Sequence, residues 1–164
     1  GELPRLSDWA DHLTTIFPEA RLKQFIEMRG ADGGPWRRLC ALPALWVGLC
    51  YDQGALDAAW DLVKDWDAEA REAWRVQASV GGLEAEVNGL KMHDLARQVV
   101  DIAEQGLKAR AMPGAGGLLP DETHFLNALN DSLESGELPA DELIRRYKAD
   151  WNGDVTRVFE EYSY

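Results

Sequence analysis

Apolar residues recur at helical spacing along most of this chain, and this pattern constrains the fold more than any other feature. Between residues 36 and 51 the apolar side chains follow the period of about 3.6 residues that is typical of a helix. They are Leu39, Leu42, Leu45, Trp46 and Leu49. Pro43 lies inside this run, which predicts a kink or a late helix start. Because segments with the same period follow as far as the C-terminus, the sequence predicts a mainly α-helical fold.

The ends of these helices are marked by residues that cap or break helices. Asp52 and Asp67 are predicted N-caps, Gly136 is a predicted stop, and Pro139 is a predicted start. The clearest amphipathic helix spans residues 92–110, with an acid early and bases late, as the helix dipole favours. A short helix is expected over residues 7–16, with Ser7 as its N-cap.

The sequence also predicts local structure in three other stretches. After Asp52, the apolar residues Leu56, Trp60, Val63 and Trp66 are predicted to share one face. Residues 83–91 alternate between apolar and polar, so a short strand or a loop is expected there. Residues 111–120 are rich in glycine and proline and predict a flexible loop.

Charge and length narrow the class of protein. The chain has 164 residues, enough for one domain with a sizeable core, and seven tryptophans, which argue against disorder. Its net charge of −12 disfavours nucleic acid and anionic membrane surfaces as partners. No apolar run reaches the roughly 18 residues that a membrane span needs. We therefore expect neither a nucleic acid nor a membrane as a partner.

The cysteines and histidines predict no metal or disulfide framework. Cys40 and Cys50 would lie about 15 Å apart on one helix, too far for a disulfide. They are interpreted as buried thiols in a reducing cytoplasm. The three histidines have no ligand spacing.

A different pattern occupies residues 21–29, where side chains alternate as they do along a strand. One face is mostly apolar and consists of Leu22, Gln24, Ile26 and Met28. The other face is mostly charged and consists of Arg21, Lys23, Phe25, Glu27 and Arg29. A loop with Gly30, Gly33, Gly34 and Pro35 follows, where the backbone can turn tightly or approach a ligand. We expect residues 1–35 to supply a strand and a glycine loop, and residues 36–164 to form a helical region.

The charged face suits phosphate chemistry. Side chains two apart on a strand are ~6.5–7 Å apart, so Glu27 could hold a divalent cation while Arg29 reaches a neighbouring phosphate. Arg21 and Lys23 would extend the positive surface toward further anionic groups of a substrate. The alternative is that these residues form ordinary surface ion pairs. Spacing alone favours that alternative, because Glu-x-Arg is a common sequence.

A longer stretch of sequence changes this balance. The run HLTTIFPEARLK at residues 12–23, with its continuation over residues 25–49, resembles glutamate–cysteine ligase of the plant and proteobacterial type. Weaker similarity continues at residues 65–66, 106–107, 125–127 and 142–143. The resemblance therefore spans essentially the whole chain and is far more specific than a short motif.

The resemblance implies an ATP- and Mg²⁺-dependent ligase with a glutamine-synthetase-like α+β fold. Such an enzyme joins the γ-carboxylate of glutamate to the amine of cysteine through an acyl phosphate, the first step of glutathione synthesis. It implies that Glu27 is a Mg²⁺ ligand and that Arg29 contacts phosphate. Arg21 and Lys23 also match the motif, and we predict that they bind substrate or phosphate.

Length separates this chain from the full enzymes of the family, which are much longer. The chain resembles only their C-terminal part, so we expect an N-terminal part of the same enzyme to supply most of the sheet, the other metal ligands, and much of the nucleotide and amino-acid sites. On this interpretation the 164 residues are inactive alone. The alternative is a non-catalytic helical module, derived from that family, that serves in regulation or oligomerisation.

Overall fold

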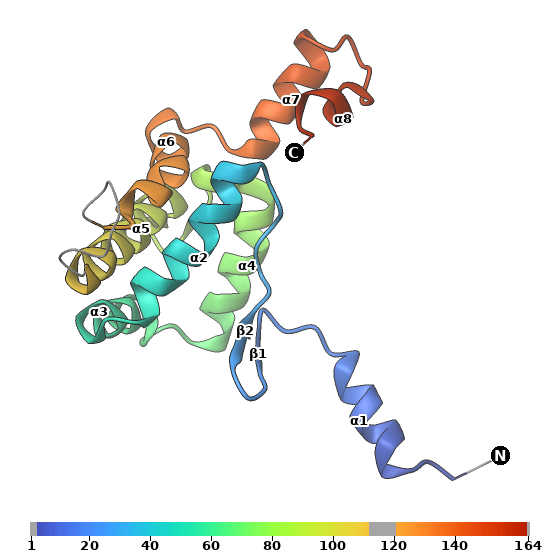
Figure 1. The fold of residues 1–164 in the computed structure, drawn as a ribbon, viewed down its shortest axis with the longest axis vertical. Helices are drawn as coiled ribbons and strands as arrows, with labels where there is room; N and C mark the ends of the chain where they lie inside the picture. The colour runs from blue at the N-terminus through green and yellow to red at the C-terminus, as the bar shows by residue number, and fades with distance from the viewer. Residues whose placement is uncertain (1–2, 112–120, 164) are drawn as a thin grey trace. The chain divides into compact units, whose positions relative to one another are not determined.

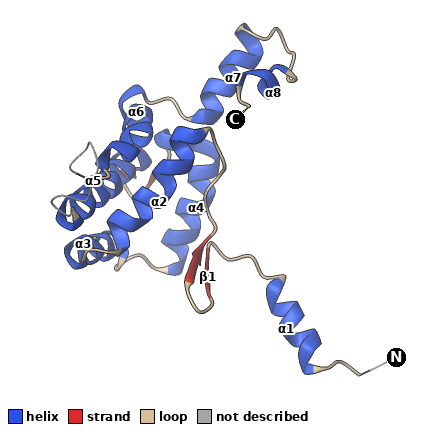
Figure 2. Cartoon of the chain, in the orientation of Figure 1, coloured by secondary structure: helices blue, strands red, loops and turns tan. Residues whose placement is uncertain are grey.

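The computed structural model describes residues 3–111 and 121–163. The chain divides into two compact units, Gly1–Gly33 and Gly34–Tyr164, and each is described by itself. The chain is mainly α-helical, as predicted, with two short two-stranded sheets in its described part (Figures 1 and 2).

The first unit holds one helix and one β-hairpin. Helix α1 spans Leu6–Thr14, and Asp8 accepts a hydrogen bond from the Arg5 backbone N–H at 2.6 Å. Arg5 is therefore the N-cap residue, and the prediction of Ser7 for that role is wrong. Strand β1 (Ala20–Leu22) pairs with strand β2 (Ile26–Met28) in antiparallel register.

The hairpin corrects the prediction of one strand over residues 21–29. Residues 23–25 form the turn, and the Lys23 N–H donates to the Phe25 carbonyl at 2.8 Å. The register places Arg21 opposite Glu27. The segment therefore finds its strand partner within itself, which the alternation of side chains could not show.

The second unit consists of helices with one small hairpin between them (Figure 1). In chain order its elements are α2 (Trp36–Cys50), α3 (Gln53–Val63), α4 (Ala68–Gly81), η1 (Gly82–Glu84), β3 (Glu86–Val87), β4 (Leu90–Lys91), α5 (Met92–Arg110), η2 (Thr123–Leu126), α6 (Asn127–Ser135), α7 (Pro139–Ala149) and α8 (Arg157–Glu161). Pro43 lies inside α2, which begins at Trp36, so the late start is wrong. Residues 83–91 supply most of η1 and both strands of the small hairpin.

Local sequence explains most helix ends. The carboxylates of Asp52 and Asp67 accept hydrogen bonds from the backbone at the starts of α3 and α4, at 2.9 and 2.7 Å. Gly136 ends α6 in a left-handed conformation that favours glycine, and Pro139 opens α7. These four predicted helix boundaries are confirmed.

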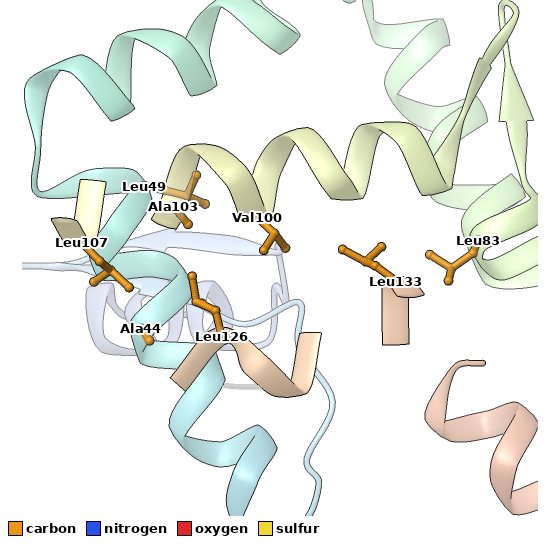
Figure 3. Packing of buried hydrophobic residues seen from close by; sticks show 8 residues of the cluster. All are labelled: Ala44, Leu49, Leu83, Val100, Ala103, Leu107, Leu126 and Leu133. Atoms are coloured by element: carbon orange, nitrogen blue, oxygen red, sulfur yellow. The ribbon is translucent and has the colours of Figure 1, made fainter. Parts of the chain in front are cut away.

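The core is built around the contact between α2 and α5, which is the largest between two elements of the described chain. Figure 3 shows its eight buried residues: Ala44, Leu49, Leu83, Val100, Ala103, Leu107, Leu126 and Leu133. Gly48 and Gly106 lie at a close approach of the two backbones. A Cβ on Gly106 would come well within 3.0 Å of the Gly48 carbonyl oxygen, and one on Gly48 would overlap the backbone of Ala103. Only glycine fits both positions.

A second apolar cluster lies where α4 packs on the small hairpin and α5. Its buried members are Trp74, Val87 and Leu95. The Trp66 ring stacks on Trp74, with centroids 5.7 Å apart and planes inclined by 20°. This cluster therefore places a pair of stacked indoles beside the turn that joins α3 to α4.

The last two helices are joined by a polar and aromatic cluster, which we term the C-terminal clasp: Glu142, Arg146, Trp151, Glu161 and Tyr162. Arg146 pairs with Glu142 at 3.0 Å and with Glu161 at 2.8 Å. The Trp151 indole N–H donates to Glu161 at 2.9 Å, and the Tyr162 hydroxyl donates to Glu142 at 2.8 Å. Burial and the hydrogen bond to Glu142 raise the pKa of Tyr162 above 10.0. Burial of Glu161 opposes its ionisation, but hydrogen bonds from Arg157 and Trp151 outweigh it and hold the pKa of Glu161 below 4.5.

Exposure on α2 and α3 differs from what the sequence pattern suggests. Of the residues predicted to share a face after Asp52, Trp66 packs against the second apolar cluster, but Leu56, Trp60 and Val63 are exposed. The buried residue of α3 is Ala55. Cys40 is half-buried and Cys50 is exposed; both are free thiols on α2. Most of the predicted flexible loop, residues 112–120, lies outside the described residues.

No single helix in the described part of the chain is both long and apolar enough to cross a membrane. Helices α2 and α3 reach that length and apolarity only together, and the pair is bent by 92°.

Candidate functional site

The β1–β2 hairpin gathers the four residues predicted from the alternating pattern. Arg21 and Glu27 are opposite each other in the register, and Arg29 directly follows β2, where its backbone N–H donates to the Glu19 carbonyl at 2.8 Å. Antiparallel pairing places directly opposite residues on the same face. The fold therefore keeps the charged groups together even though the single strand was wrong.

Burial in this hairpin is the reverse of what is usual for a small sheet. Leu22 and Ile26 are exposed, at 83% and 68% of their maximal area. The charged residues Arg21, Glu27 and Arg29 are half-buried. Because burying charge is costly unless the charge has a partner, this half-burial indicates a polar site.

Two buried atoms of this face have no hydrogen-bond partner in the described chain. They are Oε2 of Glu27 and Nη1 of Arg29. An unsatisfied buried carboxylate oxygen and an unsatisfied guanidinium nitrogen each carry a free-energy cost of about 1–3 kcal/mol or more. The pair therefore offers one acceptor and one donor to a ligand with polar groups of both kinds.

Arg21 and Lys23 make their own contacts within the first unit. Nη2 of Arg21 donates to the backbone carbonyls of Thr14, at 3.3 Å, and Ile16. Nζ of Lys23 lies 3.6 Å from Oε2 of Glu27, an ion pair beyond hydrogen-bond length. Substrate or phosphate binding by these two residues stays a prediction.

Phe17 belongs to this site and was not singled out from the sequence. Its ring centroid lies 4.7 Å from the guanidinium carbon of Arg29 and 5.7 Å from that of Arg21. The signal that could have found it is an aromatic residue a few positions before a strand with several cations. In the sequence, Phe17-Pro18 looked only like the end of the preceding helix.

The backbone conformation of the loop after β2 does not require glycine. None of Gly30, Gly33 and Gly34 has a positive φ. A Cβ on Gly33 would meet nothing within 4 Å. The loop leads directly to Pro35, the N-cap residue of α2.

The donor set limits what metal chemistry this chain could supply. Among residues 3–111 and 121–163, no three histidine, cysteine, aspartate or glutamate side chains come together to hold a metal ion. Glu27 fits a hard divalent cation, since Oε2 is a buried carboxylate oxygen without a hydrogen-bond partner among these residues. A cation site with three or more such side chains would need ligands from outside the described residues.

Comparison with known proteins identifies the family. The chain matches Glutamate-cysteine ligase family 2 (GCS2) over residues 1–161. It is 47% identical over its whole length to a chloroplastic glutamate–cysteine ligase of Solanum lycopersicum and, equally, to one of Arabidopsis thaliana. It is 45% identical to glutamate–cysteine ligase A of Oryza sativa subsp. indica.

The chain belongs to this glutamate–cysteine ligase family. It spans only 30% of the length of the tomato and Arabidopsis relatives and 32% of the rice one. Most of each relative therefore has no counterpart in these 164 residues.

Proposed function

We propose that this chain is the C-terminal part of an ATP-dependent glutamate–cysteine ligase and carries one wall of its active site. The reaction joins the γ-carboxylate of glutamate to the amine of cysteine through an acyl phosphate. Family membership supports the proposal. The observation that carries it is the pair of unsatisfied buried atoms, Glu27 Oε2 and Arg29 Nη1, on one face of the hairpin.

Glu27 is the residue that would hold Mg²⁺ in this chain. A Mg²⁺ ion bound with ATP neutralises phosphate charge and orients the phosphates. Lys23, whose ammonium lies 3.6 Å from Glu27 Oε2, balances the charge of the carboxylate. Cation binding at Glu27 would compete with this pair.

Arg29 is the residue that would bind the transferring phosphoryl group. A guanidinium donates several hydrogen bonds in a fixed plane and stays charged, which suits phosphate oxygens as charge develops on them. The unsatisfied Nη1 provides such a donor. Glutamate, cysteine and most of ATP would be bound largely by the N-terminal part of the same enzyme.

The chain alone would then be inactive, since a single carboxylate and one arginine do not complete a phosphoryl-transfer site. The alternative is a non-catalytic regulatory or oligomerisation module of the same family. That alternative tolerates the loss of both Glu27 and Arg29, whereas a ligase does not. A cytoplasmic location also stays a prediction.

The test is to replace each residue in the full-length enzyme and to measure ADP release with ATP, glutamate, cysteine and Mg²⁺. We expect Glu27→Gln and Arg29→Gln each to lower turnover about 100-fold while the thermal unfolding midpoint stays unchanged. Asp11→Asn, an exposed carboxylate of α1, is the matched control and should keep normal turnover. Near-normal turnover of Glu27→Gln at saturating Mg²⁺ would refute the role of Glu27. Robust ADP release by the 164-residue chain alone would refute its dependence on further protein.

A further inference from the structure

Phe17 lies in the segment between α1 and β1, and its ring contacts both arginines of the hairpin. The guanidinium carbons of Arg29 and Arg21 lie 4.7 and 5.7 Å from the ring centroid. Both distances fall within the roughly 6 Å over which an aromatic ring attracts a cation. A single exposed ring therefore contacts two like charges that would otherwise repel each other.

Arg21 also fixes the segment that carries Phe17. Its Nη2 donates to the carbonyls of Thr14 and Ile16, at the C-terminal end of α1 and just beyond it. Carbonyls at a helix C-terminus lack donors within the helix, so a cation satisfies them well. These hydrogen bonds tie β1 to the residues immediately before Phe17.

We propose that Phe17 is a positioning residue that holds the guanidinium of Arg29 in place for phosphate, with Arg21 as the clamp that fixes Phe17. The inference rests on the proposed function, which supplies the phosphate. An arginine side chain has many rotamers, and an arginine held before the reaction needs no reordering as charge develops. The ring contact restricts Arg29 while its Nη1 keeps a hydrogen-bonding capacity that no described residue uses.

Exposure of Phe17 makes this role separable from folding. The side chain is 72% exposed, so its truncation removes little buried surface. Phe25, in the turn of the same hairpin, is 62% exposed and has no ring contact with a cation in the described chain. It is therefore a matched control for the loss of an exposed phenyl ring.

The experiment compares Phe17→Leu, Phe17→Tyr and Phe25→Leu in the full-length enzyme. We expect Phe17→Leu to lower kcat about three- to tenfold, with a smaller change in KM for ATP, because the arginine acts mainly on the transition state. Phe17→Tyr keeps an aromatic face and should retain normal kcat, as should Phe25→Leu. Thermal unfolding midpoints should match in all three variants.

A double-mutant cycle separates this inference from the proposed function. If Phe17 acts through Arg29, Phe17→Leu has no further effect on the residual turnover of Arg29→Gln. Additive effects, a normal kcat for Phe17→Leu, or a loss in Phe17→Tyr equal to that in Phe17→Leu would each overturn the positioning role. Normal turnover of Arg29→Gln by itself would instead overturn the proposed function and, with it, this inference.

Discussion

The two units of the chain differ in which side chains they shield from solvent. In the helical unit, Leu107 is 1% exposed and belongs to a continuous apolar core. In the first unit no described residue is buried, the apolar side chains are largely exposed, and Arg21, Glu27 and Arg29 are half-buried. The helical unit therefore follows the usual rule for a folded domain, whereas the first unit is arranged around polar groups.

The apolar core that stabilises the fold and the charged residues of the candidate site therefore lie in different units. Dense apolar packing stabilises the second unit through its own sequence. The hairpin of the first unit leaves Leu22, Ile26 and Met28 exposed, a face suited to packing against further protein. Its function should therefore depend on contacts that this unit does not make within itself.

The largest expected effect tests the close helix contact of the second unit. Gly106→Val should destabilise the chain by about 4 kcal/mol or more, because any Cβ there overlaps the Gly48 carbonyl oxygen. Gly33→Val in the first unit is the control and should change the free energy of unfolding by less than about 0.5 kcal/mol, since a Cβ there meets nothing within 4 Å. Urea unfolding followed by circular dichroism measures both. Equal stability of the two variants would show that α2 and α5 do not need this contact.

A smaller effect tests the difference in apolar burial. Leu107→Ala should cost about 3 kcal/mol, because it removes buried methyl groups and leaves a cavity. Leu22→Ala should cost less than about 0.5 kcal/mol in the same 164-residue chain, because Leu22 is 83% exposed. The measurement is again urea unfolding. A cost at Leu22 that approaches that at Leu107 would show that the hairpin has a core of its own.

The smallest effect is local and concerns the C-terminal clasp. The pKa of Glu161 is lowered from 4.5, so its contribution to stability is present above that pH and is lost as pH falls through the lowered value. The pKa of Tyr162 is raised from 10.0, so its contribution is present below that pH and is lost as pH rises through the raised value. We expect the NMR signal of the Trp151 indole N–H, which donates to Glu161, to shift at both limits.

The matched control for the clasp is the Trp74 indole, which lies in the second apolar cluster away from these groups. Its signal should stay constant over the range in which that of Trp151 shifts. Glu161→Gln should abolish the shift of the Trp151 N–H signal at low pH and should leave its shift at high pH. An unchanged acid-side shift in this variant would contradict the assignment to Glu161.

Much of the fold could be predicted because its signals are local. The helix over residues 92–110 was predicted with both of its ends, since its period and its distribution of charge agree. The carboxylates of Asp52 and Asp67 cap their helices as expected. Such features depend on neighbours within a few residues, which the sequence states directly.

The errors arise where two arrangements share one local pattern. Helix α3 has apolar residues on more than one side, so its period could not show that Ala55 would be buried and Trp60 exposed. Residues 21–29 alternate in the same way in one strand or in two strands joined by a three-residue turn, and Lys23–Phe25 contains no glycine, proline or asparagine to mark that turn. The prediction that Glu27 and Arg29 share a face is the same for one strand and for two, because both arrangements place these residues on one face.

The contact between Gly48 and Gly106 also limits how this sequence can vary. Position 48 meets the backbone of Ala103, and position 106 meets the carbonyl of Gly48, so neither helix can accept a side chain at its crossing point unless the other moves away. In an alignment of related sequences, positions 48 and 106 should both stay glycine, or change together in proteins whose helices lie farther apart. Substitutions at these two positions, which are 58 residues apart in the chain, should therefore occur together.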